Sequence, residues 1–150
     1  MKLPRYATKA DELQTTFEFV SEGPRGRIPK LVQFSETNLK DFYNLAFGDK
    51  NPETGALDDL SVSNNGDSEK VLATVVDAVY AFCYRRPEAW VFAMGSTPGR
   101  TRLYQMGLNR FHAQVVEDFD VYGLQNGEWL PFQPNISYTA FVVQLKQPLI

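Results

Sequence analysis

The residues whose types and spacing best suit chemistry lie in the segment MGSTPGRTRLY, which runs from Met94 to Tyr104. Gly95 permits a tight turn, and Thr97 followed by Pro98 is typical of a helix start. The N–H groups of a first helical turn, together with the helix dipole, favour an anion. The side chains that would add hydrogen-bond donors are Ser96, Thr97, Arg100, Thr101 and Arg102. Because guanidinium groups match phosphate and carboxylate, we predict an anion site at the Gly95–Arg102 turn.

Established phosphate and nucleophile motifs do not account for this turn. The P-loop pattern is missing, and Gly95 and Gly99 lack the third glycine and the spacing of a dinucleotide fingerprint. No G-x-S-x-G nucleophile elbow surrounds Ser96, which has no obvious base beside it. The plainer alternative is a helix start whose arginines pair with acidic loops such as Asp58–Asp59. The sequence leaves both interpretations open.

A second polar cluster lies just before the first expected helix. Its members are Asp58, Asp59, Asn64, Asn65, Asp67 and Glu69. Their oxygens would suit a hard cation such as Mg²⁺. However, the spacing of a Ca²⁺ loop is missing, and Asn-Asn-Gly-Asp is also what a turn and a helix cap require. We therefore predict that Asn64, Asn65 and Asp67 contact a ligand, and we predict no metal and no cofactor.

The single histidine and the single cysteine limit the available chemistry. His112 alone excludes mechanisms that need two histidines, and a place on a helix flank is favoured over a role as general base. Cys83 follows helical apolar spacing, so we interpret it as core rather than as a catalytic thiol. One cysteine allows no disulfide within the chain. This points to a reducing compartment, and we expect the protein in the cytoplasm.

The first half of the chain is typical of strands. We predict four of them, Thr15–Ser21, Ile28–Ser35, Asp41–Gly48 and Leu57–Ser63. The first two are separated by a Gly- and Pro-containing turn and should form a hairpin.

The second half changes to helical spacing. It predicts a helix over Ser68–Arg86, which Asp67 or Ser68 can cap, and a second helix that opens at Thr97-Pro98 with a buried stripe reaching Phe119. Between them, the apolar run Trp90–Met94 predicts a central strand. Two more strands are expected, Phe119–Leu124 and Tyr138–Leu145, joined by a loop around Gln125–Asn135.

The expected order is ββββαβαββ, an α+β fold with a mixed, mostly antiparallel sheet and two helices in one domain. A strand–helix–strand crossover would make Leu57–Ser63 and Trp90–Met94 parallel neighbours. Ligands gather outside the carboxyl ends of parallel strands. The turns Asn64–Asp67 and Gly95–Arg102 would then lie at the same end of the sheet and form one site.

Composition bounds the partners. The chain of 150 residues is 43% hydrophobic and 22% charged, an ordinary globular balance, and no run of about 18 apolar residues predicts a membrane span. A net charge of −3 argues against nucleic acid, although a local basic patch would still permit it. Trp129 and Phe132 would either form an exposed aromatic surface or, as we favour, cover a sheet edge. The expected partners are a second protein or a second copy of the chain, and a phosphate-containing small ligand.

Three runs resemble an uncharacterised family of small bacterial proteins, a domain of unknown function. They are NLAFGD (Asn44–Asp49), DDLSVSNNGDSEKVLATV (Asp58–Val75) and GSTPGRTRLYQMGL (Gly95–Leu108). The likeness extends from about Tyr6 to Val143. It implies an intracellular bacterial protein, and it implies no particular activity, ligand or catalytic residue.

Two classes of function remain. The first, which we favour, is a binding or interaction domain that does no chemistry, because no complete catalytic constellation is present. The second is an enzyme acting on a phosphate-containing substrate, nucleotide or RNA, a nuclease-like toxin included. In it Arg100 and Arg102 would stabilise developing charge, and the candidates for base or Mg²⁺ ligand are Asp58, Asp59 and Asp67. The enzyme requires both arginines and one acid to face a shared, open cleft.

Overall fold

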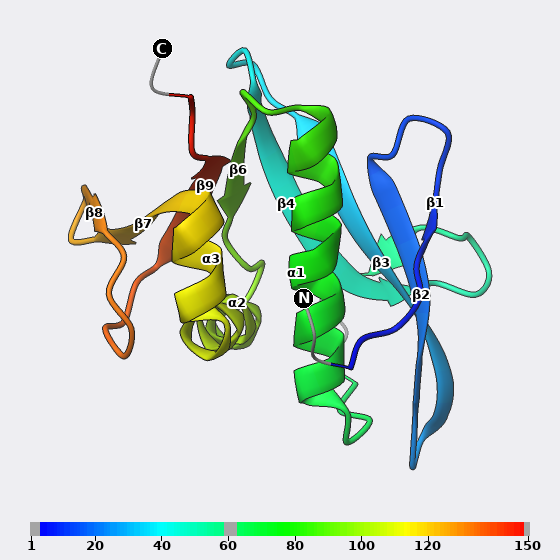
Figure 1. The fold of residues 1–150 in the computed structure, drawn as a ribbon. Helices are drawn as coiled ribbons and strands as arrows, with labels where there is room; N and C mark the ends of the chain where they lie inside the picture. Colours follow the sequence, from blue (N-terminus) through cyan, green and yellow to red (C-terminus); the bar gives the residue numbers. More distant parts are fainter. Residues whose placement is uncertain (1–3, 59–62, 149–150) are drawn as a thin grey trace.

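The fold is seen in a computed structural model, which describes residues 4–58 and 63–148 (Figure 1). Its strands are β1 (Lys9–Ala10), β2 (Thr16–Gly23), β3 (Gly26–Glu36), β4 (Phe42–Lys50), β5 (Leu57–Asp58), β6 (Trp90–Ala93), β7 (Phe119–Gln125), β8 (Glu128–Pro131) and β9 (Ala140–Leu145). Its helices are α1 (Ser68–Arg85), α2 (Pro98–Arg110) and α3 (His112–Asp118). Among the described residues, no helix is both long and apolar enough to cross a bilayer.

The described strands belong to one open, nine-stranded sheet. Their order is β1-β2-β3-β4-β6-β9-β7-β8, and β5 pairs with β4 beside this path. Among these strands, β4 and β6 form the only parallel pair; the other pairs are antiparallel. The expected class, an α+β fold with a mixed and mostly antiparallel sheet, is therefore confirmed.

One face of the sheet forms the core. Side chains on a strand alternate between its faces, so residues spaced by two share a face, as the buried Val32 and Phe34 of β3 do. Figure 1 shows α1, α2 and α3 over this face. The ring of Phe34 stacks on that of Phe82 from α1, with centroids 4.1 Å apart. The opposite face of the sheet is free of helices in the described part of the chain.

The predicted order and the count of two helices are wrong. Strand β1 pairs with β2 through Lys9 and Ala10 alone, which is too short for a period to show. Strand β8 lies where a loop was expected. The second predicted helix is two helices, because Phe111 departs from helical dihedral angles (φ −108°, ψ 18°) and separates α2 from α3. The buried stripe continues through Phe111 and Val115, so its spacing did not reveal the break.

The predicted parallel pair is also wrong. Strand β5 turns back against the end of β4, with Asp49 opposite Asp58, so these two strands are antiparallel. The first part of that β4 edge stays open, and β6 pairs there in parallel, with Phe42 opposite Trp90. The crossover through α1 therefore joins β4 to β6 in the sheet. The rest of the expected strand Leu57–Ser63 includes residues 59–62, which lie outside the described residues.

Candidate functional site

A cavity of about 320 Å³ opens where the segment before α1 meets the first turns of α2. Its lining residues are Lys30, Phe47, Ser63, Asn64, Asn65, Asp67, Ser68, Val71, Gly99, Arg100, Leu103 and Met106. The cavity thus brings together Arg100 from the predicted anion turn with Asn64, Asn65 and Asp67 from the second polar cluster. The parallel strand pair beside them is not the one that was expected. The loop before α1 and the start of α2 meet because both helices pack on the same face of the sheet.

Arg100 is the cavity residue that comes from the predicted anion turn. Its guanidinium lies over the ring of Phe47, 5.2 Å from the centroid. The ammonium of Lys30 lies 5.8 Å from the same centroid. Aromatic ring faces attract cations at such distances. Leu103 and Met106 follow Arg100 along one side of α2, so the cavity has a polar part at Arg100 and an apolar part beside it.

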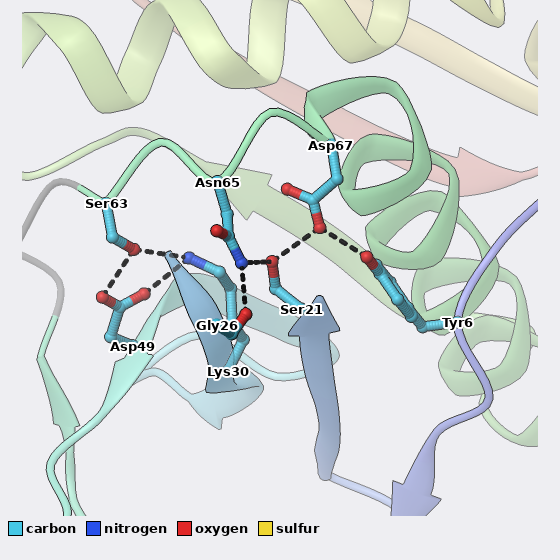
Figure 2. Close-up of polar contacts among 8 residues, drawn as sticks. All are labelled: Tyr6, Ser21, Gly26, Lys30, Asp49, Ser63, Asn65 and Asp67. Atoms are coloured by element: carbon cyan, nitrogen blue, oxygen red, sulfur yellow. Dashed lines mark hydrogen bonds and ion pairs between the residues drawn. The ribbon is translucent and has the colours of Figure 1, made fainter. Parts of the chain in front are cut away.

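Lys30 is a buried cation with its own partners (Figure 2). Its Nζ donates to Asp49 Oδ1 at 2.6 Å and to Ser63 Oγ at 2.9 Å. Ser63 Oγ in turn donates to Asp49 Oδ2 at 2.8 Å. The pairing follows from register, because Lys30 of β3 stands directly opposite Asp49 of β4. This triad fixes the Ser63 end of the loop to the sheet.

Asn65 fixes the same loop to the β2–β3 hairpin (Figure 2). Its Nδ2 donates to the Gly26 carbonyl at 2.9 Å and to Ser21 Oγ at 3.2 Å. Its Oδ1 accepts from the Arg25 N–H at 2.7 Å. A Cβ at Gly23 would lie 1.9 Å from the Asn65 carbonyl oxygen, so only glycine fits there. Asn65 lines the cavity, but its side chain is committed to holding the loop.

Asp67 occupies the N-cap position of α1 without capping it through its side chain. Its Oδ2 instead accepts from Tyr6 Oη at 2.5 Å and from Ser21 Oγ at 2.6 Å (Figure 2). Burial, and then this hydrogen bond to a carboxylate, raise the pKa of Tyr6 above its ordinary value. The carboxylate of Asp67 thereby ties the N-terminal segment to the start of α1.

The start of α2 uses its own side chains to satisfy backbone donors. Thr97 Oγ1 accepts from the Arg100 N–H at 3.2 Å, as expected of an N-cap. Thr101 Oγ1 accepts from the Gly95 N–H at 3.0 Å. A Cβ at Gly95 would lie 2.4 Å from the Thr101 nitrogen, which is the close backbone approach that the glycine suggested. These donors face the protein's own hydroxyls, so the anion-binding capacity of the turn depends on Arg100.

The remaining predicted site residues lie elsewhere or at the rim. Ser96 and Arg102 are exposed and are not among the residues that line the cavity. Asn64 lines the cavity, and its Oδ1 accepts from the Gly66 N–H at 3.1 Å. Asp58 lies in β5, and Asp59 falls outside the described residues. The enzyme hypothesis requires both arginines and one acid to face a shared cleft. Arg100 and Asp67 line the same cavity, whereas Arg102 lies outside it.

The other residues that could do chemistry, His112 and Cys83, pack against the protein's own side chains. The ring of His112 packs against that of Phe132, with centroids 5.7 Å apart. Cys83 is fully buried, and burial raises the pKa of its thiol to about 12. Within the described ranges, no group of three or more His, Cys, Asp or Glu side chains is placed to hold a metal ion.

Sequence reasoning missed the residues that the sheet contributes. Ser21, Lys30 and Asp49 end the core faces of β2, β3 and β4, and each is in phase with the buried apolar residues of its strand. A lysine in phase with Val32 and Phe34 is a signal that the alternation already contained. Phe47 was predicted only as part of a strand, because nothing in its own segment indicates that α2 would place an arginine on it.

The fold and the cavity together define a class: an α+β domain with an open mixed sheet and a partly polar cavity between the starts of two helices. The chain belongs to the Family of unknown function (DUF6934), whose model matches residues 2–146. Comparisons with curated proteins and with solved structures found no match. The resemblance to an uncharacterised family is therefore confirmed, and membership brings no activity with it.

Proposed function

We propose that this protein is a binding domain that takes a small anionic ligand, a phosphate or carboxylate with an apolar body, in the cavity between Ser63–Ser68 and α2. One observation carries the proposal: Arg100 and the polar loop before α1, which are far apart in sequence, line one cavity of about 320 Å³. That volume is at the lower end of small-molecule sites. We also propose a cytoplasmic location, because this chain's one cysteine allows no internal disulfide.

Arg100 favours an anion over a cation at its end of the cavity. The charged lining residues are Lys30, Arg100 and Asp67, and the Lys30 ammonium is already paired with Asp49 at 2.6 Å. Asp67 accepts hydrogen bonds from two hydroxyls, which stabilise its charge inside the protein. Arg100 carries five N–H donors, more than any single contact uses, and so can bind a ligand oxygen while stacked on Phe47.

The apolar lining determines the rest of the ligand. Phe47 and Val71 are buried, and Leu103 and Met106 of α2 lie beside them. A ligand with an anionic head at Arg100 would place its body against these side chains. We therefore expect phenyl phosphate or hexanoate to bind more tightly than inorganic phosphate.

The test is a thermal-shift screen of inorganic phosphate, AMP, phenyl phosphate and hexanoate against the wild type, Arg100→Ala and Arg102→Ala. A ligand at about 100 times its Kd stabilises the folded state by about 2.7 kcal/mol, which raises Tm by several degrees. We expect the Tm increase to disappear in Arg100→Ala. Arg102→Ala is the matched control, since it removes an arginine of the same helix that lies outside the cavity lining, and it should keep the increase.

Two results would contradict this function. One is the absence of a Tm increase with every anion in the wild type. The other is an increase that Arg100→Ala and Arg102→Ala reduce equally, because binding would then reflect net charge rather than this cavity.

A further inference from the structure

The helix-free face of the sheet carries a cluster of aromatic side chains far from the cavity described above. Its members are Phe42, Trp90, Phe92, Tyr122 and Trp129, from β4, β6, β7 and β8. Neighbouring rings are in contact: Phe42 with Phe92 at 5.9 Å, Trp90 with Tyr122 at 6.1 Å and Phe92 with Trp129 at 6.0 Å between centroids. Trp129 is 43% exposed, whereas its neighbour Phe132 is buried in the core.

These rings surround a hollow rather than a flat patch. Phe42, Trp90, Tyr122 and Trp129, together with Val142, line an open space of about 360 Å³. Val142 of β9 lies between Phe92 and Tyr122 in the sheet and is buried. Four aromatic walls around an apolar base are the arrangement with which proteins recognise organic cations, because ring faces are negative.

A carboxylate borders the hollow on the same face. Asp120 lies two residues before Tyr122 on β7, and it is opposite Gln144, which is itself opposite Trp90. Side chains two apart on one strand share a face, so Asp120 and Tyr122 are neighbours on it. Within the described part of the chain, the Asp120 carboxylate makes no hydrogen bond or ion pair. The five residues that line the hollow include no basic side chain.

This charge pattern distinguishes between occupants. Surfaces that bind single-stranded nucleic acid combine aromatic rings with a positively charged groove for the phosphates. Here a carboxylate stands beside the rings, and the whole chain carries a net charge of −3. A cation is attracted both by the ring faces and by Asp120.

We propose that this aromatic hollow binds a basic side chain, the ammonium of lysine or the guanidinium of arginine, presented by a partner protein. The cation lies against the rings of Trp90 and Trp129, and Asp120 neutralises its charge. The site is on the other face of the sheet from the anion cavity and does not depend on it.

The chain supplies its own probe for this proposal. Trp90 and Trp129 are its two tryptophans, and both line the hollow, so intrinsic tryptophan fluorescence reports on occupancy. The ligands are acetyl-Gly-Lys-Gly-amide and acetyl-Gly-Arg-Gly-amide, with acetyl-Gly-Glu-Gly-amide as the matched anionic peptide. We expect a saturable fluorescence change with at least one basic peptide and none with the acidic peptide.

Three variants locate the effect. Asp120→Asn should weaken binding by about two- to fivefold, the range of an exposed ion pair, and Glu117→Gln, which removes an exposed acid on α3, should leave it unchanged. Trp129→Leu keeps an apolar side chain and leaves Trp90 as reporter, and it should also weaken binding by about two- to fivefold. Urea unfolding of each variant checks that the fold is intact.

Other outcomes overturn the proposal. They are no saturable change with either basic peptide, equal binding of the acidic peptide, or unchanged binding in Asp120→Asn. Saturable quenching by oligo(dT) in place of the basic peptides would assign the face to nucleic acid. A dimer in sedimentation that Trp129→Leu dissociates would show that a second copy of the chain occupies the hollow.

Discussion

Lys30 is the residue on which the candidate cavity most depends for its shape. Its side chain is 5% exposed, and a buried ammonium is stable only when it is paired and hydrogen-bonded. Asp49 and Ser63 provide both. We did not predict Lys30 from the sequence, although the alternation of β3 would place it on the core face with Val32 and Phe34. Its partner Asp49 could not be predicted, because cross-strand pairing depends on a register that the sequence does not state.

Removing Asp49 should be costly. Asp49→Ala leaves the Lys30 charge buried without its carboxylate, and we expect the free energy of unfolding to fall by about 3 kcal/mol, as measured by urea denaturation. The matched control is Glu18→Gln, which breaks the half-exposed pair of Glu18 with Lys50 at 3.0 Å on neighbouring parts of the sheet. It should cost less than about 1 kcal/mol. Equal costs for the two changes would show that Lys30 is not dependent on its pairing.

Cys83 provides a second test at this scale. Its thiol is fully buried and burial raises its pKa to about 12, so the reactive thiolate is scarce at neutral pH. We expect a thiol reagent such as DTNB to react on the order of 10³-fold more slowly, or slower still, with the folded protein than in urea. Leu39→Cys adds an exposed thiol and should react immediately. Rapid labelling of Cys83 in the folded wild type would contradict the buried placement.

At the scale of elements, the sequence predicted a hairpin and a helix that residues close together in the chain determine. The β2–β3 hairpin and α1 were predicted within about two residues, because each has its period and its turn or cap in one stretch of sequence. The β7–β8 hairpin had a signal that we did not use. Asn126 and Gly127, both with positive φ (52° and 79°), form its two-residue turn, and Asn-Gly is typical of such turns.

The pairing of distant elements was not predictable in the same way. The expected strand Leu57–Ser63 was predicted as the parallel neighbour of β6, whereas β6 pairs in parallel with β4, which lies earlier in the chain. The contact of Arg100 with Phe47 depends on that pairing, since Phe47 is on β4. The polar clusters were therefore visible in the sequence, whereas the reason for their meeting was not.

Two glycines test how α2 is positioned. At Gly107, a Cβ would lie 3.4 Å from Leu72 Cδ2, beside an apolar cavity of about 80 Å³. Gly107→Ala should therefore raise the free energy of unfolding by about 0.5–1 kcal/mol, since alanine favours the helix. At Gly95, a Cβ would collide with the Thr101 backbone, and Gly95→Ala should lower it by about 1–3 kcal/mol. Both are measured by urea denaturation, and the same sign for both would contradict the described start of α2.

At the scale of the whole molecule, buried tyrosines should make the fold sensitive to alkali. Burial, and then a 2.7 Å hydrogen bond to Asp118, raise the pKa of Tyr80 well above 10. Its folded pKa exceeds its unfolded pKa, so its contribution to stability is complete below pH 10 and is lost as pH rises above it. We expect the free energy of unfolding to fall above about pH 10 by up to about 1.4 kcal/mol per pH unit from this group.

The measurement is urea unfolding between about pH 9 and 11, compared with Tyr80→Phe. The variant should show a shallower decline, because the phenylalanine has no proton to lose. Parallel declines in the two proteins would mean that Tyr80 titrates normally in the folded state.

The sheet separates two candidate binding surfaces, one on each of its faces. The helix-covered face ends in a polar cavity with Arg100 at its wall, and the open face carries the aromatic hollow beside Asp120. The occupants that we propose for the two surfaces are opposite in charge, a small anion on one side and a basic partner segment on the other.

The central claim is that a small anion binds between Ser63–Ser68 and the first turns of α2. Backbone amide chemical shifts, recorded by ¹⁵N NMR during a titration with phenyl phosphate, test it most directly. We predict that the largest perturbations fall on residues 63–68 and 99–106, and that Arg100→Ala removes them. Perturbations spread over the exposed basic residues, or confined to the aromatic hollow at Trp90 and Trp129, would contradict the claim.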